Sequence, residues 1–147
     1  MTTLAHLIHK NYQTQPQKTA IVMQRAGKDD LPISYRDLVA GSARYAKAYA
    51  SAGIQPGEVA VLILQHSEDL AYSFWGAILH GAIPSIMPFL TEKLSPERYR
   101  ADLSALIAVT QPAAIVTYPE FEADVRSALK AGGSARCVLL TDQLEAE

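Results

Sequence analysis

The sequence is poor in the residues from which reactive sites are usually built. Among its 147 residues there is one cysteine, Cys137, which excludes an internal disulfide and a cluster of thiolate metal ligands. Charged residues make up 19%, below the roughly 25% usual for soluble domains, and the net charge of −2 offers no electrostatic footprint for nucleic acid. No charged-then-apolar leader opens the chain, and no run approaches about 18 apolar residues. We therefore expect a cytoplasmic protein without a membrane span.

Glycine is missing from the turns where a nucleotide site would need it. Such sites lie where a parallel strand passes into a helix. The two clearest turns of this kind, Leu64–Ser67 and Thr117–Pro119, contain no glycine. Neither a G-x-G-x-x-G motif nor a P-loop occurs anywhere. Gly81 and the pair at 132–133 follow expected helices, where glycine is ordinary punctuation. We expect no nucleotide site within these residues.

What the chain does contain is centred on residues 58–88, a strand, a helix and a second strand. Val59–Leu64 is an unbroken apolar run, as expected of a strand buried on both faces. Ser67 is placed to cap the helix, Gly81 to end it, and Ile83–Met87 to form the return strand. The expected inward stripe of this helix is Leu70, Phe74 and Ile78, widened by Ala71, Trp75 and Leu79.

Before this unit, the pattern predicts a helix, a hairpin and a second helix. The first helix has an apolar stripe at Leu4, Leu7, Ile8 and Tyr12, with Thr2 or Thr3 as its cap. Thr19–Gln24 and Leu31–Ser34 read as antiparallel strands around a turn at residues 27–30. The second helix begins at Ser34 and ends near Ala52, followed by Gly53 and a Gln55-Pro56-Gly57 turn. Its expected inner stripe is Leu38, Ala43, Ala46 and Ala50.

After this unit, helices and strands keep alternating. Ser95-Pro96-Glu97 opens a helix that runs to Thr110, and Ala113–Thr117 reads as a strand. A helix from Pro119 to Leu129 and a strand at Cys137–Thr141 complete the series. The order predicts an α/β fold, a mostly parallel sheet flanked by helices with flavodoxin-like layering and an N-terminal β-hairpin addition. We expect one unit over residues 1–147.

Several residues invite a chemical role, and each has a simpler structural one. His66 and Ser67 lie at the end of a strand, but neighbours in sequence rarely meet the geometry of a nucleophile and its base, and Ser67 serves as a helix cap. His6 and His9 share a helix without a third metal ligand. His80 suits the last turn of its helix, and Glu68-Asp69 suit the first turn of theirs.

Three further features are candidate parts of a site. Cys137 begins a strand among apolar neighbours and is expected to be a buried small hydrophobe. Phe74 and Trp75 would line a ligand pocket, although core packing is favoured on so apolar a helix. The loop from Pro88 to Leu94 leaves the carboxyl end of a strand, the usual functional edge. We therefore predict no catalytic, cofactor-binding or metal-binding residue in this chain.

Four blocks in order resemble the opening of the AMP-forming adenylating enzymes. They are Gln17–Val22, Ile33–Leu38, Gly53–Val61 and the Gly81-Ala82-Ile83-Pro84 stretch that ends a small-residue helix. In that family the second block usually reads Leu-Thr-Tyr-x-Glu-Leu and the third Gly-Val-x-x-Gly-Asp-x-Val-Ala. His80 departs from the family, which usually has alanine there. Each block is weak alone, but together, in this order over residues 17–84, they form a specific pattern.

The resemblance implies an ATP-dependent acyl-CoA synthetase or acyl-AMP ligase. Such an enzyme joins a carboxylate, here expected to be a fatty acid, to AMP with the aid of Mg, and a thiol such as coenzyme A then displaces AMP. The family's phosphate loop, adenine segment, ribose-binding aspartate and catalytic lysine lie downstream, so none can be assigned here. The resemblance therefore implies an N-terminal subdomain fragment, inactive alone, of a larger ligase.

Two other classes of protein would use the same alternation of strands and helices. One is a stand-alone flavodoxin-like binding or receiver module, and the other is an assembly domain without catalysis. A receiver would want acids at its strand ends, where Gln65, His66 and Tyr118 stand instead. If the chain is a fragment, its high apolar content also predicts an exposed apolar surface and hence self-association.

Overall fold

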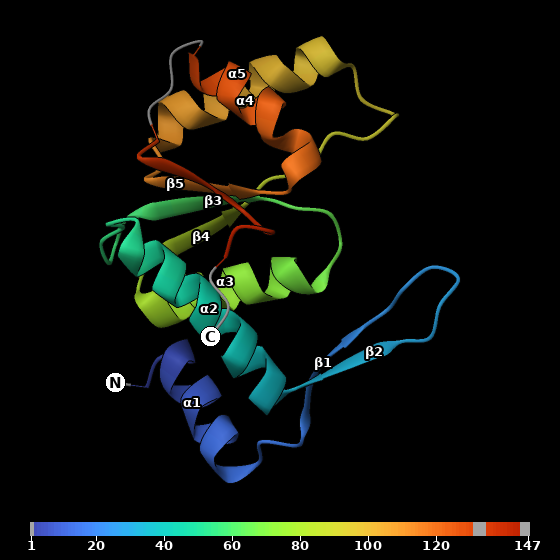
Figure 1. The fold of residues 1–147 in the computed structure, drawn as a ribbon, viewed down its shortest axis with the longest axis vertical. Helices are drawn as coiled ribbons and strands as arrows, with labels where there is room; N and C mark the ends of the chain where they lie inside the picture. The colour runs from blue at the N-terminus through green and yellow to red at the C-terminus, as the bar shows by residue number, and fades with distance from the viewer. Residues whose placement is uncertain (1, 131–134, 145–147) are drawn as a thin grey trace.

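The computed structural model describes residues 2–130 and 135–144. It confirms the α/β class: a four-stranded parallel sheet lies between two layers of helices, and a separate antiparallel hairpin extends beside them (Figure 1). The glycine pair expected to break a helix at 132–133 lies outside the described residues. The helices are α1 (Leu4–Thr14), α2 (Tyr35–Ser51), α3 (Glu68–His80), α4 (Pro96–Thr110), α5 (Glu122–Lys130) and a 3₁₀ turn, η1 (Pro119–Phe121). The strands are β1 (Thr19–Met23), β2 (Leu31–Ser34), β3 (Val59–Ile63), β4 (Ile83–Ile86), β5 (Ala114–Thr117) and β6 (Cys137–Leu140).

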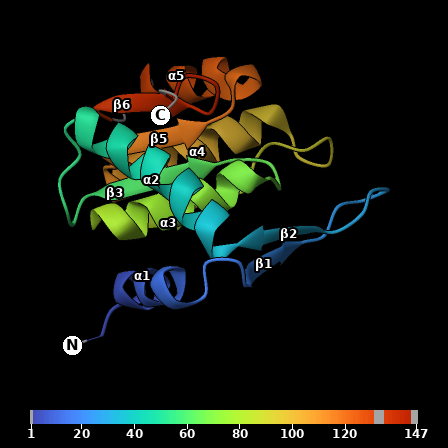
Figure 2. The same ribbon diagram turned by 60° about the horizontal axis from the view of Figure 1, so that its bottom comes forward.

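The parallel sheet has the strand order β4-β3-β5-β6. Helices α2 and α3 cover one face, and α4 and α5 cover the other, as the turned view also shows (Figure 2). Ala60 and Leu62 point to the first face and Val61 and Ile63 to the second, all fully buried. The expected unbroken apolar strand is therefore β3, a central strand with parallel neighbours on both sides.

Turns and caps follow the residues that predicted them. Ser34 accepts a hydrogen bond from the Asp37 amide at 3.1 Å, and Thr3 caps α1 together with the His6 side chain. Gly53, with φ +77°, ends α2, and the Ile54 amide donates back to the Tyr49 carbonyl at 3.0 Å. Ser67 stands at the N-cap of α3, but its hydroxyl donates to the Gln65 carbonyl, so the expected cap bond is absent.

The expected inward stripe of α2 is wrong beyond Leu38. Tyr45 and Tyr49 are buried instead of the predicted alanines, and Ala50 is exposed. The tyrosines tolerate burial because each hydroxyl has a partner: Tyr45 donates to Asp69 at 2.8 Å and Tyr49 to the Ser73 carbonyl at 2.9 Å. These two bonds join α2 to α3.

The inward stripe of α3 is also shifted from its expected place. Ser73, Gly76 and Ala77 form its buried side, while Leu70, Phe74 and Ile78 are only half-buried. Small side chains on this face let α3 approach α2 closely, since a Cβ on Gly76 would lie 2.6 Å from the Cβ of Tyr45. Part of the larger apolar surface of α3 is consequently left for another contact.

Two edges of the fold carry exposed apolar side chains. Strand β4 is an edge strand with Ile83 and Ile86 52% and 55% exposed. Helix α1 has no buried residue, and Leu4 and Leu7 of its apolar stripe are about half exposed. Within residues 2–130 and 135–144, no helix is long and apolar enough to cross a membrane.

Candidate ligand-binding edge of the sheet

The carboxyl edge of the parallel sheet is where α/β proteins usually bind ligands. Strands β3 and β5 are neighbours, but the chain leaves β3 through α3 toward one side of the sheet and β5 through α5 toward the other. Their carboxyl ends therefore form a topological switch point, the preferred place for a crevice. Gln65 follows β3 and Tyr118 follows β5, so these side chains mark the position.

Polar groups at the switch point bond mainly to one another. Buried Thr117 donates to the Ile63 carbonyl at 3.0 Å, which joins β5 to β3. Burial raises the pKa of the Tyr118 phenol, Glu120 and Asp124 add to the rise, and a hydrogen bond with Gln65 opposes it. A phenol of raised pKa stays protonated at neutral pH, so Tyr118 is available here as a hydrogen-bonding group and not as a base.

Beside the switch point an apolar groove of about 270 Å³ separates the hairpin from α3. His66 borders it, and its Nε2 atom lies 3.0 Å from the Gln24 carbonyl just after β1, which holds the hairpin against the sheet. The rings of Phe74 and Trp75 meet edge to face, with centroids 5.5 Å apart. The groove is lined by Ile21, Met23, His66, Ser67, Leu70, Ala71, Phe74, Trp75 and Ile86.

Phe74 and Trp75 pack against the core and also line a pocket, so the structure agrees with both interpretations of these residues. Each ring packs against a buried cluster, Phe74 under the main sheet and Trp75 under the hairpin, as core residues would. Each also lines the groove, as the less favoured interpretation required. Among the residues that the structure describes, His66 and Ser67 are the only polar members of the lining, and Ser67 already donates to the Gln65 carbonyl. The groove suits binding of apolar groups and carries no acid–base pair.

A second hollow, of about 260 Å³, lies between α2 and β6. Arg44 and Lys47 bring positive charge to it, and Leu139 and Leu144 bring apolar surface. The Arg44 Nε atom is buried and has no hydrogen-bond partner among the described residues. This hollow could hold an anion, but it stands away from the carboxyl ends of β3 and β5.

The other residues singled out from the sequence have structural partners. His6 takes part in the cap of α1, and no group of three metal-ligating side chains occurs among the described residues. His80 lies with its Nε2 atom 2.6 Å from the Ile54 carbonyl. Asp69 accepts from Tyr45, a role that sequence reasoning missed because the two residues are 24 positions apart.

Cys137 and the loop after β4 also differ in part from expectation. Cys137 begins β6, as predicted, but it is half-buried and not fully buried. Its burial raises the pKa of the thiol despite the nearby Arg136, which disfavours the reactive thiolate. In the loop, Phe89 and Leu90 pack against the core under α4, and the Pro88 carbonyl accepts from Tyr99 at 2.6 Å.

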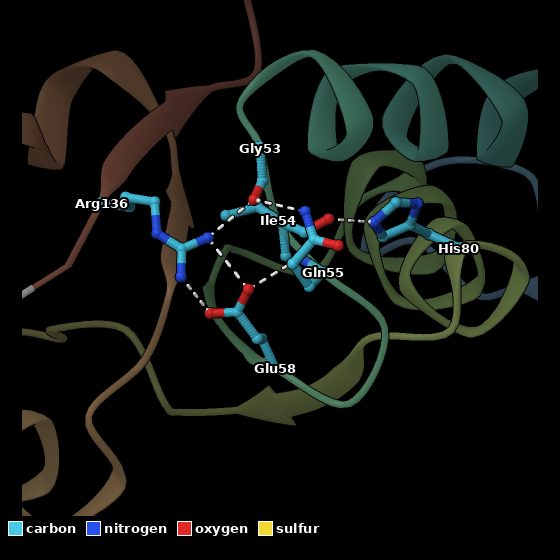
Figure 3. A network of polar contacts seen from close by, with 6 residues as sticks. All are labelled: Gly53, Ile54, Gln55, Glu58, His80 and Arg136. Carbon is cyan, nitrogen blue, oxygen red and sulfur yellow. Dashed lines mark hydrogen bonds and ion pairs between the residues drawn. The ribbon is translucent and has the colours of Figure 1, made fainter.

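At the opposite, amino edge of the sheet, Glu58 and Arg136 form a clamp (Figure 3). Both guanidinium NH₂ groups of Arg136 donate to the Glu58 carboxylate, and one also donates to the Gly53 carbonyl at 2.7 Å. The backbone amide of Gln55 donates to the same carboxylate at 2.8 Å. The clamp thus joins the turn before β3 to the residue before β6.

This clamp predicts a pH-dependent contribution to stability. Two hydrogen bonds lower the pKa of Glu58 below its ordinary value of 4.5. The larger effect comes from the Arg136 side chain and the smaller from the Gln55 backbone amide. Because the folded pKa lies below the unfolded one, the stabilisation is complete above about 4.5 and is lost as pH falls through the folded pKa. Urea unfolding of the wild type and Glu58→Gln should show midpoints that differ at pH 6 and converge below pH 4.5. A difference independent of pH would contradict this, and Arg136→Gln should reduce the same pH dependence, because the Gln55 backbone amide still donates to Glu58.

The chain matches one protein family and several solved structures. The model of the family described as AMP-binding enzyme matches residues 8–147. A fatty acid AMP ligase from Legionella pneumophila superposes with a TM-score of 0.74 at 14% identity, over 97% of this chain and 24% of that one. A benzoate CoA ligase from Burkholderia xenovorans superposes with a TM-score of 0.71 at 22% identity, over 96% and 26%.

A different adenylating protein shares the same arrangement. The adenylation domain of a keto acid-selecting NRPS module superposes with a TM-score of 0.73 at 16% identity, over 99% of this chain and 26% of that one. At these identities the superpositions establish the fold alone. This chain spans about a quarter of the length of each of these three structures. No curated protein matches the chain.

Proposed function

Because the chain belongs to the AMP-binding enzyme family, we propose that it forms the N-terminal subdomain of a longer ligase that activates a carboxylate as an acyl-adenylate. The observation that carries the proposal is the family match over residues 8–147, combined with coverage of only about a quarter of the superposed ligases. The apolar groove and the α/β sandwich described above are then framework for a reaction whose chemical groups lie elsewhere in that protein.

In this proposal the parent enzyme takes a fatty acid, ATP and Mg and releases pyrophosphate. A thiol, coenzyme A or the pantetheine of a carrier protein, then displaces AMP from the acyl group. The residues of this chain do not fit a nucleotide site of their own, because the turn after β3 and the turn before η1 lack glycine. We assign no contact with ATP, Mg or coenzyme A to any side chain here.

The proposal also concerns the chain in isolation. It alone catalyses no adenylation, it resides in the cytoplasm with its parent, and it self-associates through the apolar surface that the rest of the parent would cover. Exposed Val22, Ile83 and Ile86 support the last point, since each is more than half exposed. Light scattering over a concentration series tests it, and a monodisperse monomer at high concentration would contradict it.

The decisive experiment compares this chain with the longer protein encoded by its own reading frame. Both are assayed for pyrophosphate release from Mg-ATP against a panel of fatty acids and benzoate. We expect carboxylate-dependent release from the longer protein and none from the 147-residue chain. Carboxylate-dependent release from the chain alone, or a reading frame that ends at Glu147, would overturn the proposal and favour a self-contained module.

A further inference from the structure

The hollow of about 260 Å³ between α2 and β6 combines two kinds of surface. Its apolar part is formed by side chains of both elements and of the residues after β6, namely Ala48, Ala52, Val138, Leu139, Leu140 and Leu144. Its polar part comes mainly from α2, where Arg44, Lys47 and Ser51 follow one another at helical spacing. Gln143 completes the lining, and among the residues that the structure describes no carboxylate belongs to it.

Arg44 differs from other arginines of the chain in lacking an acceptor for its Nε–H group. Its side chain is half-buried, and the Nε atom is buried without a hydrogen-bond partner among the described residues. The Nε groups of Arg25, Arg100 and Arg126 each donate to a carbonyl or carboxylate oxygen at 2.7–3.0 Å. A buried N–H without an acceptor is costly, and buried polar groups are normally paired. A bound group that accepts from Arg44 would remove this cost.

The guanidinium group of Arg44 determines which head group fits. Its Nε–H and the adjacent Nη–H lie in one plane and point in the same direction, which matches the two oxygens of a carboxylate. Lys47 adds positive charge to the lining, but it has an interaction of its own. We therefore assign one negative charge to Arg44. A carboxylate supplies one charge, whereas a phosphate group brings up to two.

The apolar lining determines the rest of the ligand. Leu139 and Leu144 offer no hydrogen bonds through their side chains, so a polar tail beside them would lose water without gaining partners. A hydrocarbon tail gains free energy by leaving water at the same place. The volume of about 260 Å³ lies below the roughly 300–1,000 Å³ of sites for drug-sized ligands, which indicates a small molecule. The hollow thus fits a short alkyl chain that ends in a carboxylate.

We propose that the hollow between α2 and β6 is a binding site for a small monocarboxylate with an apolar chain. The carboxylate accepts hydrogen bonds from Arg44, and the chain lies against Leu139 and Leu144. The site stands away from the carboxyl ends of β3 and β5 and performs no chemistry. It does not rest on the proposed function, because every residue assigned to it belongs to the described part of this chain.

An NMR titration of the 147-residue chain with butyrate, hexanoate and octanoate tests both parts of the ligand. Saturable shifts of amide signals should centre on Ala48, Ala52, Leu139 and Leu144. Affinity should rise by up to about fourfold for each added methylene that enters the hollow. Octanoate should bind at least about tenfold more tightly than 1-octanol, which lacks the charge. Equal affinities for octanoate and 1-octanol, or shifts centred on the groove beside α3, would overturn the proposal.

Two variants of α2 test the two halves of the site separately. Arg44→Gln should weaken octanoate binding at least about tenfold, because it removes the charge and the planar pair of donors. Arg126→Gln is the matched control: it also removes one positive charge, but from α5 on the other face of the sheet, and should change the affinity by less than about twofold. Ala48→Leu fills part of the hollow and should weaken octanoate more than butyrate. Equal effects of Arg44→Gln and Arg126→Gln would contradict the proposal, as would full octanoate affinity in Ala48→Leu.

The acidic end of the chain is a competing source of carboxylates. Glu145 and Glu147 follow Leu144 in the sequence and lie outside the described residues. The double variant Glu145→Gln/Glu147→Gln should bind octanoate with the affinity of the wild type. Tighter binding by the double variant would assign Arg44 to these side chains and overturn the proposal.

The longer protein encoded by the reading frame separates this inference from the proposed function. Equilibrium dialysis with labelled octanoate should show that the longer protein binds one equivalent more than its Arg44→Gln variant. Equal binding would mean that the remaining polypeptide covers the hollow, and it would overturn the inference even in an active ligase. A lost equivalent in a longer protein without ligase activity supports the inference and overturns the proposed function alone.

Discussion

Replacing Gly76 with alanine should destabilise the protein by about 1–3 kcal/mol, the usual cost of overpacking, although the same exchange stabilises an ordinary exposed helix. A Cβ at this position would lie 2.6 Å from the Cβ of Tyr45 and 2.7 Å from the Ser42 carbonyl oxygen. Both atoms belong to the rigid part of α2, so the two helices must move apart. Urea unfolding followed by circular dichroism measures the loss.

Gly41→Ala is the matched control for this prediction. A Cβ there would meet ring atoms of Tyr72 at 2.6–2.7 Å, and Tyr72 contributes a half-buried side chain to this contact, not backbone. Both substitutions gain the same helix propensity. The difference between their losses of stability therefore reports how easily the contacting atoms can move. We expect the smaller loss for Gly41→Ala, and equal losses would show that the backbone contact at Gly76 is unimportant.

Truncating Leu103 to alanine should cost about 2–5 kcal/mol, the range for a large-to-small change in a packed core. Leu103 of α4 is fully buried, in the cluster that includes Val61 and Ile115 of the sheet. Val109→Ala on the same helix is the control, because Val109 is 85% exposed and its loss should change stability by less than about 0.5 kcal/mol. A comparable loss at both positions would mean that α4 is not docked as described.

The alternation of strands and helices was readable because its signals are local. Gly53, Gly81 and Ser34 each act at the end of a single helix. The unbroken apolar run of β3 by itself indicates a strand buried on both faces. The faces of α2 and α3 were less predictable. Tyr45 and Tyr49 tolerate burial because their hydroxyls bond to groups 24 residues away. A helical pattern within one segment cannot predict a partner at that separation.

Some residues of the candidate groove could be predicted from the sequence, but the way in which distant segments come together to form it could not. The sequence indicates that Phe74 and Trp75 pack against the core, which they do while half-buried, and it places His66 after β3. It does not indicate that β1 comes to lie beside α3, since that depends on contacts between residues far apart in sequence, such as the packing of Met23 near Trp75 and the His66 contact with Gln24, 42 residues earlier. The groove exists only through this long-range placement.

The order in which the sheet is assembled has a consequence for synthesis on the ribosome. β3 emerges well before β5, its partner in the middle of the sheet, and the Thr117–Ile63 bond closes a separation of 54 residues. Until β5 emerges, α2, α3, β4 and α4 can shelter the nascent strand, but its β5 edge stays unpaired. Closing so long a loop is slow relative to forming helices. Nascent chains that have not yet exposed residues 114–117 should therefore recruit chaperones most strongly, with release once β5 docks.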